Sequence, residues 1–248
     1  IEISEGGGIT IINTSKIAIL KSQIKNNNIT GMNGGGIYCF SSNPVIKENL
    51  VYNNHAYEYF SADEEAGAGG RGGGIYLAES NAKIIGNEIM SNYSDWGGGV
   101  HVNKGNPFIK NNLVINNDAD YYGGGLNLNS SSSIINNTIV NNSAGSGGGI
   151  YDYKSRSNII NTIIWGNDSI HEGNQVYVSN YFGEIGVSAY YYNCCIQDDI
   201  AGFGGHPFVG NSIDIIDSNP QFQDAAGNNF YLTPSSPCVD EGAIWSRL

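Results

Sequence analysis

Apolar and polar positions alternate after a glycine triplet that recurs along most of the chain. Triplets followed by isoleucine, valine or leucine begin at Gly6, Gly34, Gly72, Gly97, Gly123 and Gly147, at intervals of 28, 38, 25, 26 and 24 residues. After each triplet the apolar residues come two apart, as with Val100 and Val102, so they are expected on one face of a β-strand. The pattern predicts one supersecondary unit that is stacked several times.

A second pattern keeps the same spacing. It reads Ile-x-x-Asn-x-(Ile/Val)-x-x-Asn and starts at Ile46, Ile84, Ile109 and Ile134, with looser copies at Ile19 and Ile159. An asparagine at a turn that recurs in every layer can hydrogen-bond to the asparagines above and below it. We therefore expect two structural ladders, with Asn54, Asn92, Asn117, Asn142 and Asn167 in one and Asn49, Asn87, Asn112 and Asn137 in the other.

A period of about 25 residues favours a parallel β-helix whose coils each have three short strands and three turns. A leucine-rich repeat of similar period would need a leucine consensus, which is missing. We predict an all-β, right-handed, single-stranded parallel β-helix solenoid of about seven or more coils over residues 1–196, with an insertion at about 55–71. Residues 197–248 break the period and are expected to form an irregular C-terminal coil and cap of the same domain.

Composition and charge narrow the choice of partners. The chain has 35 glycines, only 14% charged residues and a formal charge of −12 with 11 Lys plus Arg. Nucleic acid is excluded as a partner, because its binding depends on cationic side chains that neutralise phosphates. No apolar run reaches the roughly 20 residues that span a bilayer, so no membrane-spanning segment is expected. Because the sequence begins inside a repeat, we expect a monomeric domain of a larger protein.

The cysteines leave two alternatives open. If each repeat is one coil with a rise of about 4.8 Å, Cys39 lies about 24 Å from Cys194 and Cys195, too far for a disulfide. One bridge from Cys194 or Cys195 to Cys238 is compatible with the sequence, and so are unpaired buried thiols.

Residues 6–196, which carry both motifs, resemble the right-handed parallel β-helix proteins of bacterial and archaeal cell surfaces, a superfamily that includes pectate-lyase-like polysaccharide lyases and hydrolases. The motifs also look like the repeats of polymorphic outer-membrane proteins. Asn219-Pro220-x-Phe222 and the following Y-x-L-x-x-x-S-P-x-x-D-x-G segment are similar to the closing coil of many secreted β-helix proteins. The resemblance implies a secreted or cell-surface location. It leaves function open, because this fold hosts enzymes, adhesins and binding modules.

Outward residues on the strand after each triplet suggest a carbohydrate platform. One file is expected to run Thr10, Tyr38, Tyr76, His101, Asn127, Tyr151 and Tyr177. Aromatic rings and amides suit sugars, which offer apolar faces and hydroxyl groups, and the resemblance implies that such a sheet binds substrate. The candidate substrate-binding residues are Tyr38, Tyr76, Trp96, Asn127, Tyr151, Tyr153 and Tyr177. The alternative is that tyrosines stack here because they favour a β surface.

Carboxylates gather in the turns before the triplets. Side chains one coil apart would be about 5 Å apart, close enough for oxygen ligands to share a calcium ion. The candidate calcium ligands are Asp63, Glu64, Asp95, Asp118 and Asp120. A solvated acidic loop is the alternative. If a calcium ion bridges these carboxylates and an anionic polysaccharide, the polysaccharide could bind despite the negative charge of the chain.

Candidate catalytic residues follow from two reaction types. The resemblance implies a lyase in which Lys or Arg removes a proton with the help of calcium, which would assign Lys154 or Arg156. A glycosidase would need two carboxylates about 5 to 9.5 Å apart, which Asp95 could form with Asp118 or Asp120. His101 is the one histidine in the outward file. No complete catalytic set can be assembled from these residues.

Asp152 is discordant, because strict alternation sends its side chain into the core beneath Leu128. An unpaired carboxylate would be costly there, so either the strand bulges or Asp152 has a partner.

The sequence leaves three functions open. They are a polysaccharide-binding domain, a lyase or glycoside hydrolase that uses the same face, and a structural stalk or adhesin.

Overall fold

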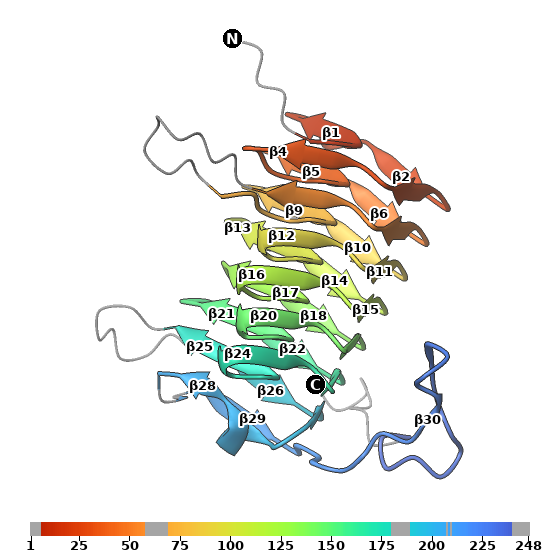
Figure 1. The fold of residues 1–248 in the computed structure, drawn as a ribbon, viewed down its shortest axis with the longest axis vertical. Coiled ribbons are helices and arrows are strands. Elements are labelled where there is room, and N and C mark those ends of the chain that lie inside the picture. Colours follow the sequence, from red (N-terminus) through yellow and green to blue (C-terminus); the bar gives the residue numbers. More distant parts are fainter. Residues whose placement is uncertain (1–5, 58–68, 180–188, 207, 209, 240–248) are drawn as a thin grey trace.

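The protein forms a stack of similar coils, which follow one another in sequence order from top to bottom of Figure 1. The computed structural model describes residues 6–57, 69–179, 189–206, 208 and 210–239. Strands one coil apart pair in parallel and form four sheets, which we call A to D. The predicted all-β parallel solenoid is confirmed. Its coils have four short strands, where three were predicted, because the Ile-x-x-Asn-x-Ile segment bends once more between its two halves.

Sheet A holds the strands that follow the glycine triplets. They are, in spatial order, β1 (Ile9–Ile12), β5 (Ile37–Phe40), β9 (Ile75–Ala78), β13 (Val100–Asn103), β17 (Leu126–Asn129), β21 (Ile150–Tyr153), β25 (Val176–Ser179) and β28 (Gly204–Gly205). Sheet B follows in each coil. Its strands are β2 (Ala18–Leu20), β6 (Val45–Lys47), β10 (Lys83–Ile85), β14 (Phe108–Lys110), β18 (Ser133–Ile135), β22 (Asn158–Ile160), β26 (Tyr190–Tyr192) and β29 (Asn211–Ile213).

Sheets C and D complete each coil. Sheet C consists of β3 (Gln23–Lys25), β7 (Leu50–Tyr52), β11 (Glu88–Met90), β15 (Leu113–Ile115), β19 (Thr138–Val140), β23 (Ile163–Trp165) and β27 (Cys195–Ile196). Sheet D consists of β4 (Asn28–Thr30), β8 (His55–Tyr57), β12 (Tyr93–Trp96), β16 (Asp118–Tyr122), β20 (Ser143–Ser146) and β24 (Asp168–Glu172).

The C-terminal part departs from this pattern. One 3-10 turn, Ile200–Gly202, precedes β28, and an antiparallel hairpin of β30 (Phe222–Asp224) and β31 (Asn229–Leu232) lies beside the stack (Figure 1). The hairpin pairs with no strand of sheets A to D in the part of the chain that the structure describes. Within those residues, no helix is both long enough and apolar enough to cross a membrane.

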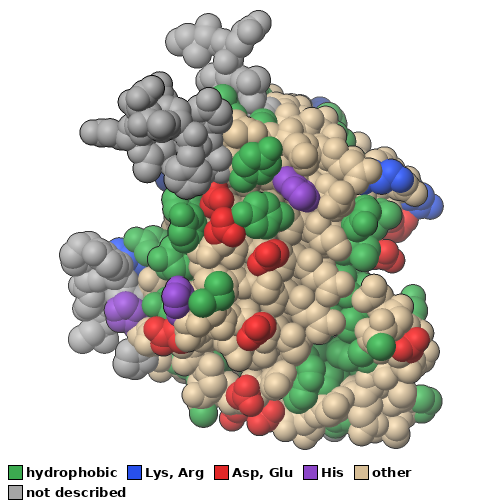
Figure 2. All heavy atoms as spheres, in the orientation of Figure 1, with side chains coloured by type: hydrophobic (Ala, Val, Ile, Leu, Met, Phe, Trp, Pro, Cys, Tyr) green, Lys and Arg blue, Asp and Glu red, His purple; other side chains and the backbone are tan. Residues whose placement is uncertain are grey.

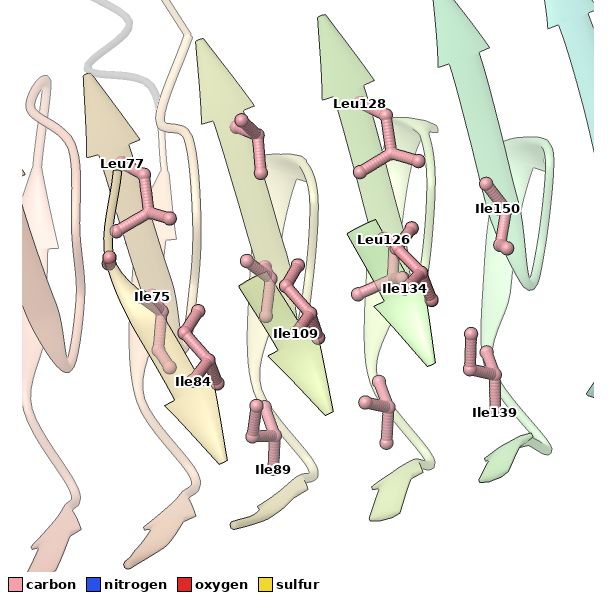
Figure 3. Packing of buried hydrophobic residues seen from close by; sticks show 14 of the residues in the cluster. Ile75, Leu77, Ile84, Ile89, Ile109, Leu126, Leu128, Ile134, Ile139 and Ile150 are labelled. Carbon is pink, nitrogen blue, oxygen red and sulfur yellow. The ribbon is translucent and has the colours of Figure 1, made fainter. Parts of the chain in front are cut away.

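The core is a set of aliphatic files that run the length of the stack. Figure 3 shows Ile75, Leu77, Leu126, Leu128 and Ile150 of sheet A facing the isoleucines of sheets B and C, and all of these side chains are fully buried. Pairing in register places equivalent residues above one another, as in the pairs Ile84↔Ile109 and Ile109↔Ile134. The apolar positions of both sequence motifs therefore fill one continuous core.

The asparagine ladders form as predicted. In the longer file, the Nδ2 atoms of Asn54, Asn92 and Asn117 donate to the Oδ1 atom of the next asparagine at 2.9–3.0 Å. Nδ2 of each also donates to a backbone carbonyl of an earlier strand, as from Asn117 to Ile89 at 2.9 Å. The residue before each ladder asparagine often has a positive φ, as Asn116 does at 52°. Together the two residues turn the chain and satisfy its buried polar groups.

The glycine triplets are required by tight turns and close packing. The first glycine of each has a positive φ, which is 73° at Gly97. A Cβ atom on the second or third glycine would collide with the backbone of the next coil, since one on Gly99 would lie 2.6 Å from the carbonyl oxygen of Gly125. A side chain at these positions would push the coils apart.

Asp152 points into the core and has partners. Its strand pairs in register with β17 and β25, so there is no bulge at this position. The backbone N–H of Ser155 donates to Oδ1 at 3.2 Å. Burial raises the pKa of Asp152 to about 6, although hydrogen bonds from Ser155 and from the backbone of Ala189 oppose that shift.

Candidate binding groove

The outward file of sheet A is continuous. Its in-register pairs are Thr10↔Tyr38, Tyr38↔Tyr76, Tyr76↔His101, His101↔Asn127, Asn127↔Tyr151 and Tyr151↔Tyr177. Tyr38, Tyr76 and Tyr151 are nevertheless only 8%, 4% and 8% exposed. These side chains lie outside the main core but have little open surface.

The rings are covered because they stack on one another. The ring centroids of Tyr38 and Tyr76 are 5.5 Å apart, and the two ring planes are nearly parallel, with an angle of 18° between them. For Tyr151 and Tyr177 the centroid distance is 5.3 Å and the angle between the ring planes is 10°. The ring of His101 lies 5.3 Å from that of Tyr76. Ring faces used in this way cannot also stack on a sugar. The open aromatic surface must therefore come from elsewhere.

A second file supplies that surface, at the corner where sheet D meets sheet A. Its members are the residues directly before the glycine triplets, and adjacent ones pair as Arg71↔Trp96, Trp96↔Tyr122 and Tyr122↔Ser146. The guanidinium carbon of Arg71 lies 4.4 Å from the ring centroid of Trp96. Tyr122 is 39% exposed, and its ring lies 4.4 Å from that of Tyr151. This corner file forms a wall beside the outward file.

The wall and the sheet enclose a groove of about 470 Å³, which we call the sheet A groove. It is lined by Arg71, Trp96, His101, Asn103, Tyr122, Asn127, Asn129, Tyr151 and Tyr153. Four predicted substrate-binding residues are among them: Trp96, Asn127, Tyr151 and Tyr153. The other three, Tyr38, Tyr76 and Tyr177, belong to the outward file but do not line the groove.

Two nitrogen atoms in the groove lack protein partners. Nδ1 of His101 and Nε1 of Trp96 are buried and have no hydrogen-bond partner among the described residues. Burial, followed by the positive charge of Arg71, lowers the pKa of His101 to about 3. The imidazole is therefore neutral at physiological pH and too weak a base to remove a proton efficiently. The neutral ring keeps one donor and one acceptor nitrogen.

The amides of the groove are held in place. Nδ2 of Asn127 donates to the backbone carbonyl of Tyr122 at 3.1 Å, which ties the floor of the groove to its wall. Nδ2 of Asn103 donates to the hydroxyl of Tyr76 at 3.1 Å. The polar surface is thus fixed before any ligand arrives, which reduces the entropy lost on binding.

The predicted carboxylates lie elsewhere. Asp95 is 4% exposed, and its Oδ2 accepts a hydrogen bond of 2.6 Å from the backbone N–H of Gly70. Asp118 and Asp120 are exposed on β16, where they accept hydrogen bonds from Ser143 Oγ and Tyr93 Oη, each 2.6 Å long. Figure 2 shows acidic side chains spread along this face at intervals. None of the three carboxylates lines the sheet A groove.

The described residues contain no group of three or more His, Cys, Asp or Glu side chains placed to hold a metal ion. Asp63 and Glu64, the other two predicted calcium ligands, lie outside the described residues. Calcium binding stays a prediction from the sequence.

The predicted bases are at the rim. Lys154 follows β21, and its Nζ lies 5.7 Å from the ring centroid of Tyr153, while Arg156 is exposed beyond it. Of the six candidate catalytic residues, only His101 lines the groove. Asp95, Asp118, Asp120, Lys154 and Arg156 are not brought together with it.

Arg71 and Tyr122 were missed as lining residues. The signal that identifies them is their position directly before a triplet, which they share with Trp96. That position looks variable in sequence, because it holds Asn33, Arg71, Trp96, Tyr122 and Ser146 in successive coils. Alignment of the repeats on the triplet would have grouped these residues into one file.

Comparison with known proteins supports the fold. The family model described as "Right handed beta helix region" matches residues 1–161. A search of curated proteins found no match. Among solved structures, HetL, a pentapeptide repeat protein involved in heterocyst differentiation regulation from the cyanobacterium Nostoc, is 9% identical, with 87% of this chain and 88% of that chain covered and a TM-score of 0.23. A likeness this low carries no structural or functional weight. The family match spans more than half of a chain that folds as stacked parallel coils, and the chain therefore belongs to the right-handed beta helix family.

Proposed function

We propose that this protein is an extracellular or cell-surface domain that binds polysaccharide in the sheet A groove. The observation that carries the proposal is the composition of the groove, in which aromatic surface at Trp96, Tyr122 and Tyr153 lies beside the fixed amides of Asn103 and Asn127. Sugar rings offer apolar faces for the aromatic wall and hydroxyl groups for the polar floor. The location is an expectation from the resemblance to surface β-helix proteins.

The shape of the groove also suits a chain ligand. It crosses strands β13, β17 and β21, which are neighbours in sheet A. Adjacent strands are about 4.8 Å apart, so the floor spans roughly 10 Å, enough for about two sugar units. A polysaccharide can extend past both ends, whereas a compact metabolite would gain little from an open floor.

Affinity electrophoresis against a panel of neutral and uronate-containing polysaccharides tests this proposal. Trp96→Ala removes the half-buried indole ring from the wall, and we expect at least a tenfold weaker binding of the retained glycan. Trp165→Ala is the matched control, because Trp165 is a half-buried tryptophan on sheet C, away from the groove. Equal retardation of the two variants would refute binding in the groove, as would the absence of retardation across the panel.

Turnover and calcium are measured in the same experiment. Release of reducing or unsaturated sugar ends would indicate a lyase or hydrolase, whose catalytic groups would then need to be sought outside the six candidates. Loss of retardation in the presence of a chelator would support calcium-assisted binding of an acidic glycan. A stalk or adhesin that uses the coils only as a spacer predicts no retardation by any glycan.

A further inference from the structure

We propose that Cys195 and Cys238 form a disulfide that fastens the C-terminal part of the chain to the last full coil. Each thiol is the leading influence on the pKa of the other, which is raised at Cys195 and lowered at Cys238, and both cysteines are free thiols in this structure. Both also line one small cavity of about 160 Å³. A disulfide needs two cysteine side chains that meet at one point of the fold, and the shared cavity places both side chains there.

The direction of the strand decides which cysteine of the adjacent pair reacts. Successive residues of a strand point to opposite faces. Cys194 is fully buried and belongs to the main core, with its Sγ 3.4 Å from the backbone oxygen of Ile159. Cys195 faces away from that core, and its Sγ lies 3.3 Å from the backbone oxygen of Ser218, in the C-terminal part. The structure therefore selects Cys195 from the two alternatives that the sequence leaves open.

The remaining thiols are protected. Cys39 is fully buried on β5, near the opposite end of sheet A from β28. Burial raises the pKa of both Cys39 and Cys194 to about 12, so the reactive thiolate form is scarce at physiological pH. Two of the four thiols are thus poorly reactive, which leaves Cys195 and Cys238 as the pair that can react.

The chemistry needs a disulfide oxidant, for which a small molecule such as oxidised glutathione is sufficient. Cys238 is the half-buried partner and its pKa is lowered, chiefly by the hydrogen bond from Cys195, so it supplies the attacking thiolate. The Cys238 thiolate attacks one glutathione sulfur and releases the other glutathione as a thiolate. Cys195 then loses its proton, attacks Sγ of Cys238 and displaces the second glutathione. Both released thiolates take up protons. One oxidised glutathione thus gives two molecules of reduced glutathione, and one protein disulfide forms.

The bond would close a loop that contains β28, β29 and both hairpin strands. No strand pairing joins the hairpin to sheets A to D in the described chain, because β30 and β31 pair only with each other. A cross-link restricts the unfolded chain and so stabilises the folded one. Cys195 pairs with Ile216 through a single bridge, and the disulfide would secure that connection.

The test is native oxidation followed by thiol counting and peptide mapping. The reduced protein is incubated with oxidised glutathione, the remaining thiols are alkylated, and the mass and cross-linked peptides are measured. We expect two thiols to disappear with the loss of two hydrogen atoms, and the midpoint of thermal unfolding to rise by several degrees. The reductant dithiothreitol should reverse both changes.

Three variants separate the alternatives. Cys238→Ser and Cys195→Ser should abolish the cross-link, whereas Cys194→Ala, the matched control next in sequence, should retain it. Four intact thiols in the oxidised wild type would overturn the proposal. It would also be overturned by a cross-link that persists in Cys195→Ser, or by glutathione attached to Cys238 with no internal bond. The peptide map of the wild type decides the question even if a variant fails to fold.

Discussion

At the scale of single residues, the structure separates the roles of side chains that look alike in sequence. Asp95 and Asp118 both come shortly before glycine triplets, on the neighbouring strands β12 and β16, yet Asp95 is buried against Gly70 and Asp118 is exposed. The difference arises because residues 69 and 70, at the end of the long insertion, pass over Asp95. No local pattern encodes that approach, so the sequence could propose these carboxylates as ligands but could not distinguish them.

Asp152 is the residue whose burial should have a measurable effect on how the stability of the protein depends on pH. Its pKa is raised from 3.8 to about 6, so the folded state holds its proton more tightly than the unfolded state. Stability from this group is full below about pH 4, falls as the pH rises to about 6, and is then constant. The loss is at most about 3 kcal/mol. The hydroxyl of Tyr191 is buried nearby and has no hydrogen-bond partner among the described residues, so it does not stabilise the ionised carboxylate of Asp152.

We therefore expect Asp152→Asn to stabilise the protein at pH 8, by about 1–3 kcal/mol, and to have a much smaller effect at pH 4. Urea unfolding of both proteins across this range gives the difference directly. Asp118→Asn is the control, because that side chain is exposed and should change stability by less than about 0.5 kcal/mol. If the benefit of Asp152→Asn were the same at every pH, ionisation of Asp152 would not be its cause.

At the scale of the element, the two-residue corner is the unit that the repeat preserves. A residue such as Asn116 turns the chain with a positive φ, and the next, Asn117, fills the buried ladder. Sequence spacing alone predicted the ladder, because each asparagine repeats in step with an apolar residue. The sheet A groove was harder to predict, since its wall is built from Arg71, Trp96 and Tyr122, which share a position in the repeat but not a residue type.

Removal of one ladder residue should be costly. Asn117 donates to Asn142 and Ile89 and accepts from the backbone and side chain of Asn92. Asn117→Ala leaves several buried groups without partners, and we expect a loss of at least about 3 kcal/mol in the free energy of unfolding. Asn116→Gly is the matched control, because this exposed neighbour has a φ that glycine adopts easily, and it should change stability by less than about 0.5 kcal/mol. Similar losses in both would mean that the corner, and not the ladder, is the stabilising feature. Chemical denaturation supplies both values.

At the scale of the whole molecule, each coil contacts mainly the coils directly above and below it. The sheets pair in sequence order, so β14 of sheet B lies between β10 and β18 and meets no distant strand. Such a molecule behaves as a one-dimensional array, in which stability is a sum of coil and interface contributions. Period and alternation made this architecture predictable. The C-terminal hairpin was not predictable in the same way, because it has no counterpart in the earlier coils.

A one-dimensional array predicts how far the effect of one core substitution extends along the stack. Ile109→Ala in β14 removes a fully buried side chain from a central coil and should cost about 2–5 kcal/mol. In native-state hydrogen exchange we expect the loss of amide protection to be greatest in β10, β14 and β18 and to decrease toward β2 and β29, because only neighbouring coils share the cavity. Lys110→Ala, whose half-buried side chain alternates with Ile109 on the same strand, should leave protection nearly unchanged. A uniform loss of protection from β2 to β29 would instead mean that the solenoid opens as a single cooperative unit, and the energy of each coil could then not be assigned separately.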